Sequence, residues 1–245
     1  MIRTALVLVF LVPYGLVACP LAILLSLVSG SVAPLYGFST FGLRWAFAIA
    51  GVRIVLEHRE RLGDIRNTVL AANHLSHLDP PAIYLALGVR LVALAKREVF
   101  DIPLFSTVIR RAGFLSIQRG DRQDAANAVN KMTEALRGGA CVMVFPEGTR
   151  SPTGELMPFK KGTFVAALEA KSRIFPLAVF GTGALMPIHG YAVRPGRVRI
   201  VVLDPVDAGR YSYAERDSLV AEVRGRIAAA LQADRDRTAG ERSVA

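Results

Sequence analysis

The hydrophobic pattern divides the chain into an apolar N-terminal segment and a longer alternating part. No charged residue occurs at positions 4–43, and the stretch 5–28 alone matches the roughly 20 apolar residues that cross a bilayer core. Prolines and glycines interrupt this run, so the pattern predicts a kinked helix, a bend at residues 29–37 and a second helix at residues 39–52. The segment therefore indicates contact with a membrane.

Three other interpretations of this segment stay open. Arg3, an apolar run and Cys19 together resemble a lipoprotein signal, and a removed signal peptide has similar regions, but the apolar run continues well beyond Cys19, which neither cleaved signal needs. A hairpin buried in a protein core is the third interpretation, because apolar periodicity does not distinguish lipid from protein. Arg44 in the second helix suits a membrane interface better than a bilayer centre.

After residue 51, short apolar strands alternate with amphipathic helices. The predicted strands cover residues 52–58, 67–73, 90–96, 114–119, 140–145, 174–181 and 197–203. The predicted helices cover residues 80–88, 102–113, 122–139 (with Asp121 as N-cap) and 161–170. This alternation predicts an α/β fold: a mixed, largely parallel sheet covered by helices, with functional groups at the carboxyl ends of the strands. A hydrophobic helix pair precedes it.

The charge and the hydrophobic content of the chain indicate what kind of molecule it binds. The formal net charge is +10 and 52% of the residues are hydrophobic, a combination that suits a partner both apolar and anionic, such as a membrane surface. Nucleic acid would explain the charge but not the long aliphatic runs, so we expect no nucleic-acid partner. Cys19 and Cys141 lie far apart, so they predict neither a disulfide framework nor a metal site, and the bulk of the chain is expected to be intracellular.

A first polar cluster follows the predicted strand at residues 67–73. His74 comes directly after that strand, and Asp79 precedes two prolines at a helix start. On a turn the two side chains can meet, so that the carboxylate fixes one ring nitrogen and the other nitrogen becomes a base for a hydroxyl proton. A substrate can supply that hydroxyl, and no protein nucleophile is then required.

Plainer interpretations of these residues exist. Asp79 alone is typical of an N-cap, and His77 of a structural or pocket-lining residue. Two histidines and an aspartate within ligand reach also suit a metal. A metal hydrolase needs further ligands, however, and the only later histidine, His189, has no acidic partner at a recognisable spacing. We therefore predict no metal site.

A second polar cluster follows the predicted strand at residues 140–145. Its members combine a glycine with acidic, hydroxyl and cationic side chains: Glu147, Gly148, Thr149, Arg150, Lys160 and Lys161. A glycine that permits close backbone approach, a forked guanidinium and nearby ammonium groups form a receptor for phosphate. The plainer alternative, a surface loop with incidental charge, does not explain why both clusters follow strands.

Together the clusters resemble the glycerolipid acyltransferase family, whose best-known bacterial members are the 1-acylglycerol-3-phosphate acyltransferases. The family's first block, Asn-His followed by four residues and Asp, is matched by Asn73, His74 and Asp79. Its third block, Phe-Pro-Glu-Gly-Thr-Arg-Ser, is matched without a change by residues 145–151. The resemblance covers roughly residues 51–205, and the two blocks in this order are far more specific than either alone.

The other family blocks are matched less well. Gly113 and Arg119 of the second block are kept, but Gln118 stands in the acidic place. The fourth block is matched only through Pro176 and its apolar neighbours, and Lys96 resembles the family's basic residue ahead of the second block. These departures leave the implied reaction class intact and the acceptor open.

The resemblance implies an O-acyltransferase of phospholipid biosynthesis. It would move a fatty acyl chain from acyl-CoA or acyl carrier protein to the free hydroxyl of 1-acylglycerol-3-phosphate (lysophosphatidic acid), making phosphatidic acid. His74 and Asp79 are the implied catalytic pair, and backbone N–H groups near the helix start after Asp79 are expected to hold the oxyanion. Glu147 is expected to orient Arg150 or a glycerol hydroxyl. The implied substrate-binding residues are Lys96, Arg119, Glu147, Gly148, Thr149 and Arg150. No metal or tightly bound cofactor is expected.

This function predicts three segments. Residues 1–52 are membrane-anchoring helices, residues 53–233 the catalytic domain, and residues 234–245 a disordered tail. We expect the enzyme on the cytoplasmic face of the inner (cell) membrane, among membrane lipids. Two alternatives stay open: an acyltransferase for another lysolipid, such as a lyso-ornithine lipid or a lysophospholipid, and a non-catalytic lipid-binding protein, which would not need the pair His74 and Asp79.

Overall fold

The structure is a computed structural model that describes residues 1–117 and 122–243. Gln118, Arg119 and the predicted N-cap Asp121 lie outside the described residues. The α-helices are α1 (Ile2–Ser29), α2 (Ala33–Ala50), α3 (Asp79–Leu87), α4 (Phe105–Arg111), α5 (Arg122–Arg137), α6 (Gly162–Glu169), α7 (Thr182–Leu185) and α8 (Arg216–Ser243). The strands are β1 (Val52–Glu57), β2 (Thr68–Ala72), β3 (Val92–Lys96), β4 (Leu115–Ile117), β5 (Cys141–Val144), β6 (Arg173–Phe180), β7 (Gly196–Val202) and β8 (Val206–Asp207).

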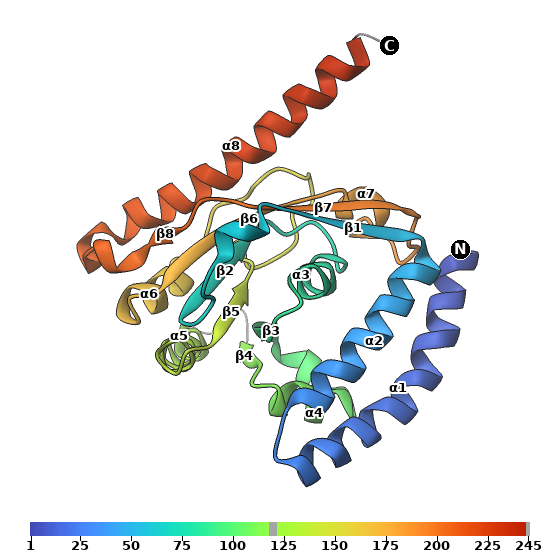
Figure 1. The fold of residues 1–245 in the computed structure, drawn as a ribbon. Coiled ribbons are helices and arrows are strands. Elements are labelled where there is room, and N and C mark those ends of the chain that lie inside the picture. Colours follow the sequence, from blue (N-terminus) through green and yellow to red (C-terminus); the bar gives the residue numbers. More distant parts are fainter. Residues whose placement is uncertain (118–121, 244–245) are drawn as a thin grey trace.

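The strands form a mixed sheet in the order β1-β7-β6-β2-β5-β3-β4, with β8 beside β6 (Figure 1). β2 runs parallel to β5 and β6, and β3 runs parallel to β5 and β4. β6 is antiparallel to β7 and β8, while β1 is parallel to β7. The predicted mixed, largely parallel sheet is confirmed. Because β2 and β5 are parallel, their carboxyl ends meet at one edge, which brings residues 73–79 beside residues 145–151.

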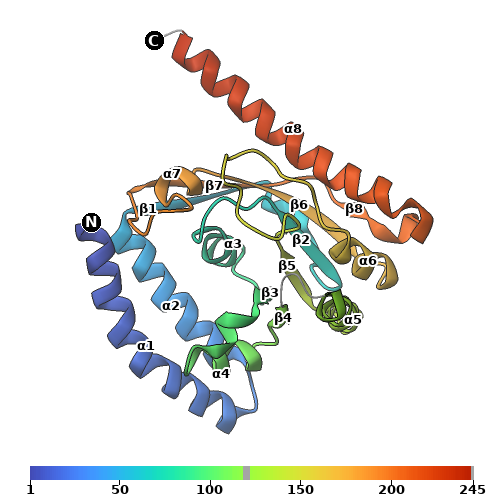
Figure 2. The ribbon, with the colours of Figure 1, turned by 180° about the vertical axis from the view of Figure 1, so that it is seen from behind.

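Helices cover both faces of this sheet (Figures 1 and 2). Adjacent residues of β2 show the division: Leu70 belongs to the core that contains Ile83 of α3, and Val69 to the core that contains Phe164 of α6. The first core also includes residues of α2, and the second includes residues of α5 and α8. Both faces of β2 are therefore buried, as expected for a central strand in a parallel region.

The predicted N-terminal helix pair is present as α1 and α2, which pack side by side (Figures 1 and 2). α1 continues through both of its prolines and ends at Gly30, whose φ of 64° is readily adopted by glycine. α2 begins at Ala33, earlier than predicted, because Pro34 lies in its first turn, where proline is tolerated. α1 is long and apolar enough to cross a membrane, and most of its apolar side chains are exposed. It has the length and composition of a membrane anchor.

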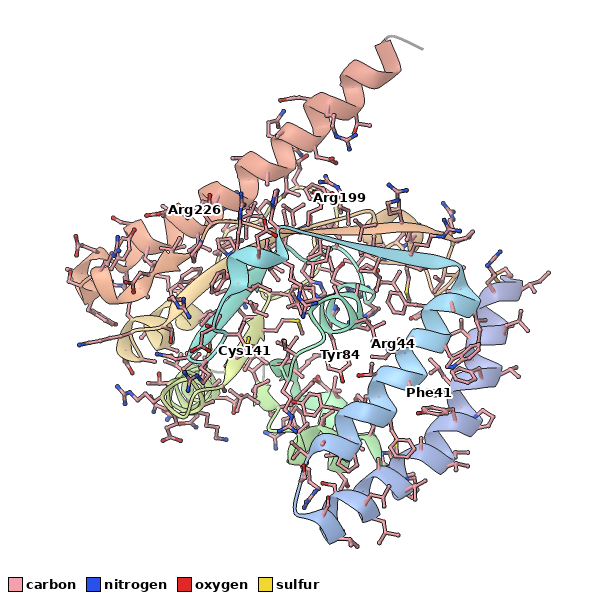
Figure 3. All side chains as sticks on the ribbon, viewed as in Figure 1. Phe41, Arg44, Tyr84, Cys141, Arg199 and Arg226 are labelled. Atoms are coloured by element: carbon pink, nitrogen blue, oxygen red, sulfur yellow. The ribbon has the colours of Figure 1, made fainter. Side chains whose placement is uncertain are left out.

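Polar contacts fix this pair to the rest of the molecule. The guanidinium of Arg111 in α4 donates to both the hydroxyl and the carbonyl of Ser26 at 3.2 Å, and Ser26 is fully buried. The hydroxyl of Tyr36 in α2 donates to the carbonyl of Leu91 at 2.9 Å, and the hydroxyl of Tyr84 in α3 donates to the carbonyl of Tyr36 at 3.0 Å. Figure 3 shows Tyr84 directed toward α2. The helix pair is thus a fixed wall of the domain.

The C-terminal helix differs from the sequence prediction. A disordered tail was expected from residue 234, whereas α8 continues to Ser243 (Figure 1). The physical reason is a set of ion pairs on its second half. Asp234 accepts a hydrogen bond from Arg199 of β7 at 2.5 Å, and Arg235 pairs with Glu155 at 2.8 Å. Pairs at helical spacing add to these contacts, from Gln232 to Asp236 at 2.7 Å and from Arg237 to Asp234 at 2.9 Å, and stabilise this part of the helix locally.

A side chain extends the sheet beyond the end of β2. The amide group of Asn73 donates from Nδ2 to the carbonyl of Val179 at 2.9 Å and accepts from the N–H of Val179 at 2.7 Å. Asn73 is 2% exposed, so these bonds form out of water. They fix the point at which the chain leaves the sheet for His74.

We predict that Asn73→Ala destabilises the fold. Removal of the amide leaves a buried N–H and a buried carbonyl of Val179 without partners, which is expected to lower the free energy of unfolding by about 2 to 4 kcal/mol. Asn130→Ala, at an exposed position of α5, should change it by less than about 0.5 kcal/mol. Denaturant unfolding of the detergent-solubilised variants measures both values, and equal midpoints would contradict the assigned role of Asn73.

Candidate active site

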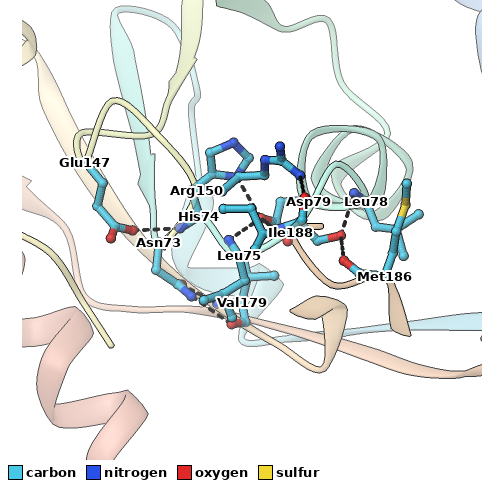
Figure 4. Close-up of polar contacts among 11 residues, drawn as sticks. Asn73, His74, Leu75, Leu78, Asp79, Glu147, Arg150, Val179, Met186 and Ile188 are labelled. Atoms are coloured by element: carbon cyan, nitrogen blue, oxygen red, sulfur yellow. Dashed lines mark hydrogen bonds and ion pairs between the residues drawn. The ribbon is translucent and has the colours of Figure 1, made fainter. Parts of the chain in front are cut away.

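His74 and Asp79 form a hydrogen-bonded pair at the carboxyl edge of the sheet (Figure 4). The distance from His74 Nδ1 to Asp79 Oδ2 is 2.7 Å, and the side chains are 12% and 0% exposed. A carboxylate only accepts, so Nδ1 donates and Nε2 is left without a proton in the neutral ring. The ring of Phe145 stacks on that of His74 with centroids 4.1 Å apart, which fixes the imidazole plane. The loop and turn between the two residues bring His74 and Asp79 together, as predicted.

Asp79 does not cap α3 as the plainer interpretation proposed. It is the first residue of the helix, and its Oδ2 points back into the preceding loop, where it accepts from the N–H groups of Leu75 at 2.7 Å and Ser76 at 2.8 Å. Ser76 in turn donates from its hydroxyl to the carbonyl of Met186 at 2.8 Å. The carboxylate therefore organises the loop that carries His74 and presents the same oxygen to the imidazole.

The expected oxyanion donors after Asp79 are not available. Pro80 and Pro81 have no N–H, and the N–H of Ala82 donates to the carbonyl of Leu78 at 3.0 Å. That sequence prediction is wrong for the first turn of α3.

Glu147 has a different position from the one expected. Its Oε1 accepts from the backbone N–H of His74 at 2.8 Å, and its Oε2 accepts from the N–H of Met157 at 2.9 Å. Both carboxylate oxygens thus bind backbone, while Arg150 donates to the carbonyl of Ile188 at 3.1 Å. Burial raises the pKa of Glu147, and the two backbone hydrogen bonds oppose that rise. Glu147 therefore holds the chain at His74 in place.

The glycine of the second cluster permits a close contact. Gly148 has a φ of 73°, and a Cβ at this position would lie 2.6 Å from Cε of Lys160. The Lys160 side chain thereby lies against the loop that follows β5, and it is one of the residues that line the cavity beside His74. Its neighbour Lys161 points away and pairs with Asp217 at 2.8 Å. Thr149 is exposed beside Gly148.

A large apolar cavity leads from the catalytic pair to the helix pair. Its volume is about 1110 Å³, and its lining includes His74 together with apolar side chains of α1, α2, α4 and α5. Lys96, Arg150 and Lys160 are its cationic lining residues in the described part of the chain. Lys96 also pairs with Glu98 at 2.7 Å, with half of the lysine side chain exposed. The cavity therefore has an apolar body, and the loop bonded to the backbone of His74 contributes Arg150 and Lys160, which form its cationic end.

The remaining predictions have mixed outcomes. Arg119 lies outside the described residues. His77 lines the cavity as expected, and burial, with the cationic Arg150 as a second cause, lowers the pKa of His77. The sequence predicts both Lys160 and Lys161 as members of the phosphate cluster, because it gives no means of telling the two neighbouring lysines apart. Within residues 1–117 and 122–243, no three His, Cys, Asp or Glu side chains gather in a way that would hold a metal ion.

A protein-family model described as acyltransferase matches residues 53–180. The chain belongs to this acyltransferase family. It is 32% identical over 164 residues to a chloroplastic 1-acyl-sn-glycerol-3-phosphate acyltransferase of Arabidopsis thaliana. The aligned residues cover 66% of this chain and 44% of that protein. It is 27% identical over 185 residues to the 1-acyl-sn-glycerol-3-phosphate acyltransferase of Borreliella burgdorferi, covering 75% of this chain and 74% of that protein.

The fold also matches a solved acyltransferase. The crystal structure of the 1-acyl-sn-glycerophosphate acyltransferase of Thermotoga maritima superposes with a TM-score of 0.80 and 25% sequence identity, covering 96% of this chain and 97% of that chain. The predicted family resemblance and fold class are confirmed. The chain spans less than half the length of the plant protein from Arabidopsis.

We predict a pH-dependent effect of Glu147→Gln on stability. Because burial raises the pKa of Glu147 above its ordinary 4.5, the folded protein binds this proton more tightly than the unfolded chain does. Wild-type stability therefore falls as the pH rises from 4.5 through the raised pKa, and the glutamine variant lacks this loss.

Thermal unfolding of both proteins from about pH 4 to about pH 8 measures the effect. The Tm of the variant minus that of the wild type should become more positive as the pH rises. A difference that stays constant, or that becomes more negative, would show that the carboxyl is not held at a raised pKa.

Proposed function

We propose that the protein is an O-acyltransferase that moves a fatty acyl chain from a thioester to the free hydroxyl of 1-acylglycerol-3-phosphate, making phosphatidic acid. The observation that carries this proposal is the His74–Asp79 pair, which lies at the wall of an apolar cavity with a cationic end. The 1-acyl-sn-glycerol-3-phosphate acyltransferases of Arabidopsis and Borreliella, to which the chain is similar, support the same acceptor. The donor is acyl-CoA or acyl carrier protein.

The chemistry follows from the tautomer of His74. Nε2 removes the proton of the acceptor hydroxyl as its oxygen attacks the thioester carbonyl, and Asp79 stabilises the imidazolium that forms. The tetrahedral intermediate then expels the thiolate and leaves an ester on the acceptor. Thiolate is a good leaving group, and the imidazolium returns the proton to it. The reaction in this form needs no metal or tightly bound cofactor.

We assign the cationic end of the cavity to the acceptor phosphate. Arg150 supplies a guanidinium and Lys160 an ammonium group at this end, and we propose Arg119 and Lys96 as further phosphate ligands. The apolar body beyond them has the character needed for an acyl chain. Thr149 and Gly148 line the same end and shape the space beside the phosphate.

We further propose that α1 and α2 hold the enzyme on the cytoplasmic face of the cell membrane, in contact with membrane lipids. Arg3, Arg44 and Arg53 flank the apolar segments, and all three are exposed. Arginines at both ends of the pair favour one side of the membrane for both ends. Phe41 and Trp45 of α2 are 53% and 52% exposed, which suits an interfacial face (Figure 3 labels Phe41 and Arg44).

Replacement of the general base tests the reaction. We predict that His74→Ala lowers kcat for acyl transfer by about 10²- to 10⁴-fold while the protein stays folded. His77→Ala, the matched control on the same loop, should lower it by less than about tenfold. The assay uses purified protein, acyl-CoA and acyl carrier protein as donors, and a panel of lysophosphatidic acid, lysophosphatidylcholine and a lyso-ornithine lipid.

The panel separates the alternatives. Preference for an acceptor without a phosphate monoester would replace lysophosphatidic acid by another lysolipid, and absence of transfer to every acceptor would favour a lipid-binding protein. Equal losses in the two histidine variants, or loss of activity with a chelator, would favour a metal site.

The phosphate assignment generates a separate prediction. A charge-assisted hydrogen bond contributes about 1.5 to 3 kcal/mol, so Arg150→Ala should lower kcat/KM for lysophosphatidic acid by about 10- to 100-fold and leave the donor KM within about twofold. Arg137→Ala removes a similar bond from guanidinium to backbone carbonyl, at Glu169, on the outside of the domain and serves as control. An unchanged acceptor kcat/KM in Arg150→Ala would exclude this arginine as a phosphate ligand.

A further inference from the structure

The loop at residues 151–160 is tied to the backbone of His74 from two directions. The N–H of Ser151 donates to the carbonyl of His74 at 2.8 Å, and the hydroxyl of Ser151 donates to the carbonyl of Glu155 at 2.7 Å. From the other direction, Glu147 accepts from the N–H of His74 and from the N–H of Met157. The position of the catalytic imidazole therefore depends on where this loop is held.

Helix α8 holds the loop through one arginine. Arg224 donates from Nε to the carbonyl of Met157 at 3.2 Å and from Nη2 to the carbonyl of Leu156 at 2.7 Å. The carbonyl of Met157 thus accepts a hydrogen bond from Arg224, and the N–H of Met157 donates one to Glu147. The contacts form a continuous path from α8 through Met157 and Glu147 to the backbone of His74.

The helix is a firm support for this contact. Leu219, Val223 and Ile227 lie one turn apart on α8 and are fully buried in the core beneath the sheet. Arg224 follows Val223 directly, so its backbone is fixed by that packing. Arg235 of α8 reaches the same loop through Glu155.

We propose that Arg224 is a positioning residue of the active site, which sets the geometry of His74 through Met157 and Glu147. The proposal rests on the acyl-transfer function given above and adds α8 to the catalytic apparatus. Arg224 acts through hydrogen bonds to two successive carbonyls, for which a planar fork is suited and a point charge is less so. Arg224 is not a lining residue of the cavity, and the two hydrogen bonds above lead to Leu156 and Met157.

Its loss should alter turnover more than binding. A small displacement of a catalytic group lowers the rate strongly, since reacting atoms must be aligned to a fraction of an ångström. We expect Arg224→Met to lower kcat by about tenfold or more, with the KM of donor and acceptor each within about twofold of the wild type. Arg224→Lys should recover part of the loss.

Arg226 provides a matched control on the same helix (Figure 3 labels it). It donates from Nη1 to two successive carbonyls, those of Asp204 at 2.8 Å and Pro205 at 3.2 Å, and from Nη2 to the carboxylate of Glu222 at 2.5 Å. None of these bonds leads to Glu147. Arg226→Met removes an equivalent pair of carbonyl hydrogen bonds and, in addition, an ion pair within α8, so it is the more demanding control and should still leave kcat within about twofold. Comparable Tm values for the two methionine variants separate positioning from global destabilisation.

Coupling to Glu147 provides the decisive readout. If Arg224 acts through Glu147, the kcat loss of the double variant Arg224→Met/Glu147→Gln should be clearly smaller than the product of the single losses, whereas Arg226→Met/Glu147→Gln should give the product. Hydrogen exchange of the amides at residues 151–160 should accelerate in Arg224→Met and not in Arg226→Met. Equal kcat in the two methionine variants, or multiplicative losses with Arg224, would overturn the proposal. Absence of acyl transfer in the wild type would instead refute the proposed function, and the exchange measurement would still decide whether Arg224 holds the loop.

Discussion

The hydrogen bond between Nδ1 of His74 and Oδ2 of Asp79 sets the geometry of the active site. At 2.7 Å, with the carboxylate fully buried, it determines which ring nitrogen carries the proton and which faces the cavity. The same oxygen accepts from two backbone N–H groups, so the loop geometry and the tautomer are set together. A change that moves the carboxylate therefore changes the loop as well as the base.

Next to this bond, hydrogen bonds from side chains, and not from a sheet or helix, hold the backbone of the loop in place. Asn73 continues the sheet by binding both backbone groups of Val179, and Glu147 binds the N–H of His74. The sheet supplies the position, because the carboxyl ends of β2 and β5 meet at one edge. Buried amide and carboxylate groups in such places are held firmly, since each would be unfavourable without its partners. The apolar cavity then adjoins a base whose surroundings are already ordered.

Much of this arrangement was predictable from local pattern. The alternation of strands and helices gives the sheet, and His74 and Asp79 stand out because polar residues follow a buried strand. The role of Glu147 was not predictable, since its partners are backbone N–H groups that carry no residue signature. Lys160 and Lys161 are equivalent in sequence, and only the contact with Gly148 and the ion pair with Asp217 separate them. The attachment of α8 at residues 234 and 235 depends on Arg199 and Glu155, which are distant in sequence from their partners.

The difference between local pattern and distant contacts also explains why the sequence predicts the start of α2 at residue 39, whereas the helix begins at Ala33. The apolar run predicts two helices, but the start of α2 depends on the tolerance of proline in a first turn. The attachment of α1 depends on the carbonyl of Ser26, which accepts from Arg111, and that of α2 on the carbonyl of Leu91, which accepts from Tyr36. Contacts of this kind decide boundaries and orientation, whereas periodicity decides the kind of element.

The kinetics of Asp79→Asn test whether Asp79 makes His74 the base. The amide keeps the shape of the carboxylate but can turn its NH₂ group to Nδ1 and so reverse the tautomer, as in the comparable aspartate substitution of a serine protease triad. We expect kcat to fall by about 10³- to 10⁴-fold, with the protein still bound to lipid. An NH₂ group in the place of Oδ2 cannot accept from the N–H groups of Leu75 and Ser76, so the Tm should fall as well. A variant that retains kcat within about tenfold of the wild type would contradict the claim that Asp79 makes His74 the base.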